Sequence, residues 1–218
     1  MSYFSYKFNT DYGMFNFRSG NIKLGETING VNIRPGFDCK NCQYCFQDCY
    51  ARVSYAYYPE VKTNWNNNSQ TLRAIDRANN WEVLTEPVNK FLKRKKPLYL
   101  RYLVSGDLLS QQNLFAYMQI ALSNPKTNFL LFTKYYELDF SLVKFIKNLN
   151  VLISVFPLTP IEDFSHLVDR LPIAFINGDK RIKYFIGNNP EKYVCGGSCI
   201  TCKKCYTEKG QPRIFNLH

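Results

Sequence analysis

The stretch Tyr99-Leu100-Arg101-Tyr102-Leu103-Val104-Ser105-Gly106-Asp107 joins a short apolar run, rich in aromatic side chains, to a glycine turn. A short apolar run that ends in a turn signal is typical of a buried strand. Three further runs of this kind follow in the chain, at residues 129–133, 152–156 and 173–176. We therefore expect four buried strands in the second half of the chain.

Amphipathic segments separate these predicted strands. Residues 111–122 and 140–149 lie between the first three strands, and a shorter segment at 161–168 precedes the fourth. Regular alternation of strands with amphipathic helices is typical of β-α-β units and a parallel sheet. The sequence therefore predicts an α/β fold whose sheet is either open or curved into a partial β/α barrel.

The first part of the chain has a different pattern. Residues 1–37 contain short alternating pieces such as Met14-Phe15-Asn16-Phe17, which predict strands with turns at Ser19-Gly20 and Asn29-Gly30. The polar stretch at residues 64–69 is expected to be a loop or the start of a helix. Helices are expected near residues 50–57 and over residues 70–78 and 81–94. We expect a single domain over residues 1–218, with an N-terminal part (1–96), a β/α core (97–190) and a C-terminal part (191–218).

Composition sets limits on the class of protein. The sequence is 45% hydrophobic and 16% aromatic, which excludes global disorder. No apolar run approaches the roughly 20 residues that span a bilayer, and the N-terminus has no apolar signal core. We therefore expect a soluble, cytoplasmic protein without a membrane partner. The 28 basic and 17 acidic side chains give a formal charge of +11, which permits binding to nucleic acid or to a small anionic ligand.

All eight cysteines fall in two short sets with mirrored spacing. The first set, C-x2-C-x2-C-x3-C, comprises Cys39, Cys42, Cys45 and Cys49, and the second, C-x3-C-x2-C-x2-C, comprises Cys195, Cys199, Cys202 and Cys205. Disulfides are disfavoured because the N-terminus has no signal peptide, the chain is larger than most disulfide scaffolds, and no cysteines are spread through its body. Four-cysteine zinc sites are the next alternative, but three cysteines at successive x2 spacing do not split into the two pairs of a zinc ribbon.

Iron–sulfur clusters fit the spacing best. The run C-x2-C-x2-C-x3-C is that of bacterial-type ferredoxins, in which the fourth cysteine ligates the other cluster of a pair. We therefore predict two [4Fe–4S] clusters and a role in redox chemistry or electron transfer, with a redox partner. One arrangement places Cys39, Cys42, Cys45 and Cys195 on one cluster, and Cys199, Cys202, Cys205 and Cys49 on the other. In the simpler alternative each cluster takes its own local four; we favour the exchange, which requires the N- and C-terminal parts to meet.

Charged side chains lie in or just after the predicted strands. Asp107 follows the first strand, Lys134 follows the second, and Arg101 lies within the first. Ligands of parallel α/β sheets bind beyond the carboxyl ends of the strands, so these residues are candidate catalytic or anion-binding residues. Asp107 fits equally well as the N-cap of the following helix.

The densest basic run supports an alternative function. Residues 90–96 contain five basic side chains, and Tyr99 and Tyr102 follow closely. Basic and aromatic residues together suit single-stranded nucleic acid. The alternative function is therefore a protein that binds nucleic acid or a host protein and carries structural zinc sites. The basic run can also be explained without a partner, as the polar end of a helix.

Several strings resemble a bacteriophage family known as the "gene product eighty-eight" type. They are Asn21-Ile22-Lys23-Leu24-Gly25, Cys45-Phe46-Gln47-Asp48-Cys49-Tyr50-Ala51, the Arg101 to Asp107 string, Phe132-Thr133-Lys134 and the cysteines of residues 195–205. The resemblance covers most of residues 14–206. It implies phage origin, hence the cytoplasm of a host bacterium, but no particular activity, so whether the protein is an enzyme is not predicted.

A broader resemblance is to radical S-adenosylmethionine enzymes. Residues 195–202 have their C-x3-C-x2-C spacing, which implies a [4Fe–4S] cluster on a partial β/α barrel and, as a third function, radical chemistry. Two features depart from that family. The motif follows the β/α region instead of the first strand, and Thr201 stands where those enzymes carry an aromatic residue.

Overall fold

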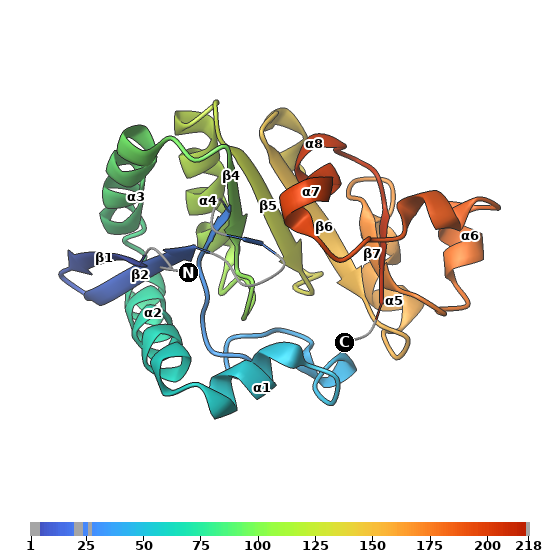
Figure 1. Cartoon of the computed structure of the whole chain (residues 1–218), viewed down its shortest axis with the longest axis horizontal. Helices are drawn as coiled ribbons and strands as arrows, with labels where there is room; N and C mark the ends of the chain where they lie inside the picture. The colour runs from blue at the N-terminus through green and yellow to red at the C-terminus, as the bar shows by residue number, and fades with distance from the viewer. Residues whose placement is uncertain (1–4, 20–23, 26–27, 217–218) are drawn as a thin grey trace.

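The computed structural model describes residues 5–19, 24–25 and 28–216, and its strands form one sheet (Figure 1). Eight strands of this described part lie in the sheet in the same order as in the sequence. They are β1 (Ser5–Thr10), β2 (Gly13–Ser19), β3 (Ile28–Gly30), β4 (Tyr99–Tyr102), β5 (Asn128–Thr133), β6 (Leu149–Val155), β7 (Ile173–Ile176) and β8 (Arg213–Phe215).

Strand direction divides the sheet into two parts. β1 pairs antiparallel with β2, and β2 antiparallel with β3. From β3 to β8 every neighbouring pair is parallel. The α/β class and the parallel sheet predicted from the sequence are confirmed. The described strands have β1 and β8 at the two edges of the sheet, and these edges do not pair, so a barrel is not shown.

The helices of the described part precede or separate the parallel strands. They are α1 (Tyr50–Tyr57), α2 (Pro59–Arg77), α3 (Glu82–Lys95), α4 (Gln111–Ser123), α5 (Ile161–Phe164), α6 (Ile182–Ile186), α7 (Cys199–Cys202) and α8 (Lys204–Thr207). No helix in the described ranges is long and apolar enough to cross a bilayer.

The two faces of the sheet carry cores of different size. Along β5, Phe129 and Leu131 belong to the large core, which also contains the buried side chains of α2, α3 and α4. Leu130 points to the opposite face, since successive side chains of a strand alternate. There it joins a small core that includes Cys205 and Tyr206. The C-terminal helices α7 and α8 lie over this second face, in front of β5 and β6 (Figure 1).

The predicted helix at residues 140–149 is wrong. The structure has only a 3-10 turn there, Val143–Phe145, and β6 begins at Leu149. Phe140, Val143, Ile146 and Leu149 are all buried at intervals of three residues. That spacing resembles one face of an α-helix, but a tight connection with 3-10 geometry also buries every third residue.

Two expectations for the N-terminal half also need correction. Asn29-Gly30, expected as a turn, belongs to β3, whereas Gly20 of the other expected turn lies outside the described residues. The polar stretch at 64–69 lies within α2, not in a loop, and Asn68 and Ser69 on it are buried. The sequence pattern did not predict a buried helix here. In a sequence, a polar side chain that bonds to backbone inside the protein cannot be distinguished from one exposed to solvent.

Asn68 fixes α2 to the sheet through its amide. Its Oδ1 accepts from the Asn16 backbone N–H at 2.6 Å, and its Nδ2 donates to the carbonyls of Asn16 and Asn32, both at 2.9 Å. We expect Asn68→Ala to lower the free energy of unfolding by about 2–3 kcal/mol, because buried backbone groups lose their partners. Urea unfolding measures this loss. Asn67→Ala, at the less buried neighbouring position, should change little, and equal effects of the two substitutions would contradict the assignment.

Candidate metal centre and strand-end site

The first cysteine set lies in the loop between β3 and α1, at the carboxyl ends of β4 and β5. Three hydrogen bonds hold it there. The Asp107 backbone N–H donates to the carbonyl of Asp38 at 2.7 Å, and Asn41 Nδ2 donates to the carbonyl of Lys134 at 2.7 Å. The Tyr50 hydroxyl donates to the carbonyl of Val104 at 2.5 Å. The chain segments that follow both strands therefore contact the cysteine loop directly.

Asp38, which directly precedes Cys39, binds the loop to α2. Its carboxylate is buried, accepts from the Ser69 hydroxyl at 2.5 Å and is paired with Arg73. It also accepts from the backbone N–H of Arg34 at 3.0 Å, and the Arg34 guanidinium lies 3.5 Å away. Sequence reasoning missed this residue. Its one signal was an acidic side chain next to the first cysteine.

The thiols of the first set are free, and they influence one another. Burial raises the pKa of Cys39 to about 12 and that of Cys45 to about 11, while the charge of Lys134 opposes both shifts. The charge of Cys42 contributes to the raised pKa of both thiols, and that of Cys49 contributes at Cys45.

Asp107 joins the ends of β4 and β5. Its Oδ1 accepts from the Leu108 backbone N–H at 2.8 Å and from the Thr133 hydroxyl at 2.6 Å, and its Oδ2 accepts from the Lys134 backbone N–H at 2.7 Å. Asp107 is not the N-cap of α4: Ser110 caps that helix by accepting from the Asn113 N–H. The side chain of Asp107 is fully buried and both of its oxygens accept hydrogen bonds. Asp107 therefore holds the chain after β4 to the end of β5.

Lys134 is the buried cation of the first set. Its Nζ lies 3.9 Å from Asp107 Oδ2, and its side chain is 13% exposed. Burial acts to lower the pKa of Lys134, but the neighbouring Asp107, Cys45 and Cys39 raise it, and the net direction is upward. Burial also raises the pKa of Asp107, against the opposing charge of Lys134. The structure thus brings together two of the three charged candidates, Asp107 and Lys134, near Cys39 and Cys45.

Arg101 lies apart from that pair, on the face of the sheet that carries α7 and α8. Its guanidinium carbon is 4.8 Å from the centroid of the Phe132 ring. Its Nε is buried and has no hydrogen-bond partner among the described residues. Burial raises the pKa of Tyr206, and the charge of Arg101 acts to lower it, so Arg101 also lies near the second cysteine set.

The second cysteine set is attached to β6 and β8. Asn150 Nδ2 on β6 donates to the carbonyl of Cys205 at 2.8 Å, and the Cys195 N–H donates to the carbonyl of Ile214 at 2.7 Å. Buried Arg213 donates to the carbonyl of Lys204 at 3.0 Å and pairs with Glu208 at 2.9 Å. β8, a strand of three residues, was not predicted, and neither was this use of Asn150 and Arg213.

The thiols of the second set differ in exposure. Burial raises the pKa of Cys205 to about 11, while Arg213 opposes the shift through its charge and a hydrogen bond. The charges of Cys195 and Cys199 add to the rise. Cys202 is exposed.

The thiols could hold a metal centre by their chemistry rather than by their present spacing. Within the described ranges, no group of three or more His, Cys, Asp or Glu side chains is arranged to hold a metal ion. The donors are soft thiols, with Lys134 beside one set and Arg213 beside the other to balance thiolate charge. Both sets thus fit a thiolate-bound centre in donor type, provided that the thiols draw together.

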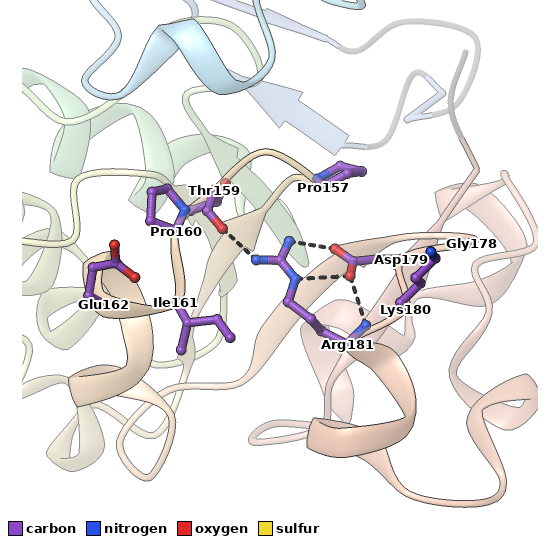
Figure 2. Close-up of a pocket in the computed structure, with 9 residues that line it drawn as sticks. All are labelled: Pro157, Thr159, Pro160, Ile161, Glu162, Gly178, Asp179, Lys180 and Arg181. Atoms are coloured by element: carbon purple, nitrogen blue, oxygen red, sulfur yellow. Dashed lines mark hydrogen bonds and ion pairs between the residues drawn. The ribbon is translucent and has the colours of Figure 1, made fainter.

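A cleft of about 610 Å³ lies beyond the carboxyl ends of β6 and β7 (Figure 2). Arg181 reaches across it: Nε and Nη2 donate to Asp179 at 2.9 and 2.6 Å, and Nη1 donates to the carbonyl of Thr159 at 2.5 Å. Nη2 also donates to the carbonyl of Phe156 at 2.6 Å. Because these bonds occupy the guanidinium, Arg181 braces the two strand-end loops.

The basic run at residues 90–96 does not form the aromatic surface expected for nucleic acid. Most of it lies in the last turns of α3, as the alternative interpretation predicted. Tyr102 is fully buried, and Tyr99 packs against Tyr206 with ring centroids 5.1 Å apart. Neither ring is available to stack on a base at this end of α3.

These features define an α/β protein with a largely parallel sheet and two four-cysteine segments, one at the strand ends and one on the sheet face that α7 and α8 cover. Residues 15–176 match the family model described as Gene product 88, and the chain belongs to this family. The match includes the first cysteine set with Arg101, Asp107 and Lys134, and it ends before the second set. No curated protein and no solved structure matches the chain, so the resemblance to radical S-adenosylmethionine enzymes gains no support.

Proposed function

We propose that this member of the family is an iron–sulfur protein that carries two [4Fe–4S] clusters and serves electron transfer or redox-linked chemistry. The observation that carries the proposal is the placement of all eight cysteines in two sets of four, each beside a buried cation. Thiolates are the ligands of such clusters, and nearby cations and amide donors tune their potential. When bound, the clusters would supply the one-electron chemistry.

In the simpler of the two arrangements, each cluster takes its own set. The charge of Cys42 acts on Cys39 and Cys45, and the charges of Cys195 and Cys199 act on Cys205. A cluster bound by four thiolates is a dianion, so Lys134 and Arg213 would each lie beside one negative centre. In this arrangement one cluster would lie at the strand ends and the other on the sheet face that α7 and α8 cover. A redox partner could approach the exposed Cys202.

Arg101 is the candidate for a small anionic ligand between the two sets. Of the three charged candidates, Asp107 and Lys134 are engaged with each other, whereas Arg101 contacts a ring and forms no ion pair in the described part. A guanidinium without a carboxylate partner suits a carboxylate or phosphate ligand, or the negative charge of a cluster.

Metal identity is the first test of the proposal. We expect protein purified without oxygen to be brown and to contain about eight iron and eight sulfide per chain, as two [4Fe–4S] clusters require. Iron, sulfide and zinc analysis, together with the absorption spectrum, measures this. Colourless protein with stoichiometric zinc and no sulfide would instead support the structural-zinc alternative and end the iron–sulfur proposal.

A further inference from the structure

The surface beside the first cysteine set carries two exposed phenylalanine rings. Phe37 is 72% exposed and Phe46 is 44% exposed, although large apolar side chains usually become buried on folding. Phe46 lies next to the backbone that carries Phe37: a Cβ atom added to Gly36, the residue before Phe37, would lie 3.5 Å from Cε2 of Phe46. A pair of solvent-facing rings at one place calls for a functional explanation.

Arginine side chains surround these rings. The Arg34 guanidinium lies 5.0 Å from the Phe37 centroid, and that of Arg52 lies 3.6 Å from the Phe46 centroid. Arg52 also donates to the carbonyl of Phe46 at 2.7 Å, and Arg73 donates to the carbonyl of Phe37 at 2.7 Å. We call this surface the aromatic–arginine patch; it consists of Arg34, Phe37, Phe46, Arg52 and Arg73.

The charge of the patch is positive. Three arginines belong to it, and the carboxylate that pairs with two of them, Asp38, is buried beneath the surface. The chain as a whole carries a formal charge of +11. A polyanion is therefore the partner that the charge favours.

We propose that the aromatic–arginine patch binds single-stranded nucleic acid. Unpaired bases offer flat faces that stack on exposed rings, and the phosphates between them interact with the guanidinium groups. In a duplex the base faces are already stacked on their neighbours, so the patch should prefer single strands. The site requires no metal chemistry, so nucleic-acid binding and iron content can be measured separately.

Fluorescence anisotropy with a labelled homothymidine strand of about 16 nucleotides tests the proposal. We expect binding to the single strand and much weaker binding to the matching duplex. The dissociation constant should rise roughly tenfold or more when salt increases from about 50 to about 200 mM, because phosphate contacts release counterions. Phe37→Ala and Phe46→Ala should each weaken binding about tenfold, which is the loss of one stacked base.

Matched variants separate stacking from general charge and from misfolding. Phe37→Trp keeps a flat ring and should retain binding. Phe145→Ala removes another exposed ring with a cation over it, since Phe145 is 66% exposed with Lys144 at 5.0 Å, and should leave binding unchanged. Unchanged affinity in both patch alanine variants, equal loss in Phe145→Ala, or a patch that only mediates self-association would overturn the proposal. Iron and sulfide analysis of the same variants distinguishes failure of this proposal from failure of the iron–sulfur proposal.

Discussion

Asp107→Ala is expected to lower the free energy of unfolding by about 3–5 kcal/mol, because it leaves a buried charge without its partner. The substitution removes the acceptor of the Leu108 and Lys134 backbone N–H groups and of the Thr133 hydroxyl. It also leaves the buried Lys134 ammonium without its nearest carboxylate. Urea unfolding under reducing conditions, on protein without metal, measures this loss directly.

The conservative substitution at this site should fail to rescue stability. In Asp107→Asn the amide nitrogen would face the N–H of either Leu108 or Lys134, so that two donors oppose each other. The matched control is Asp169→Ala, at an exposed position, with an expected change within about 0.5 kcal/mol. If Asp107→Ala lowered the free energy of unfolding by less than about 1 kcal/mol, Asp107 would not be the residue that holds β4 to β5.

The parallel part of the sheet was predictable because its strands are short apolar runs. Residues 129–133 and 173–176 lie within β5 and coincide with β7, and a strand buried on both faces needs apolar side chains at nearly every position. β8 gave no such signal, since Arg213 in it is a charged residue. Its burial depends on the pairing with Glu208, which lies outside the strand and cannot be read from local composition.

Some members of the candidate site were predictable from the sequence, but their roles were not. Strand-end position alone selected Asp107, Lys134 and Arg101, and the structure places all three near the cysteine sets. The three residues differ in the partners of their polar atoms. Asp107 accepts hydrogen bonds from backbone N–H groups, whereas the Arg101 guanidinium lies near the Phe132 ring. Asp38 and Asn150 were missed because their partners lie far away in the sequence, in α2 and α8.

If the protein carries the two proposed clusters, the second large effect is the loss of one or both of them when cysteines are substituted in pairs. Cys42→Ser with Cys45→Ser removes two ligands of the same cluster under either arrangement. About half of the iron and sulfide should therefore remain, as one intact cluster. This pair serves as the reference, because the two arrangements do not differ in it.

Cys45→Ser with Cys195→Ser separates the arrangements. If each cluster takes its own set, the pair removes one ligand from each cluster, and we expect neither cluster to remain intact. If the sets exchange a ligand, both substitutions fall on one cluster, and the protein should keep about half of its iron and sulfide, like the reference pair. The simpler arrangement, one set for each cluster, predicts the first outcome. Iron and sulfide analysis with electron paramagnetic resonance of the reduced protein distinguishes them, and a spectrum matching the reference pair would establish exchange between the two ends of the chain.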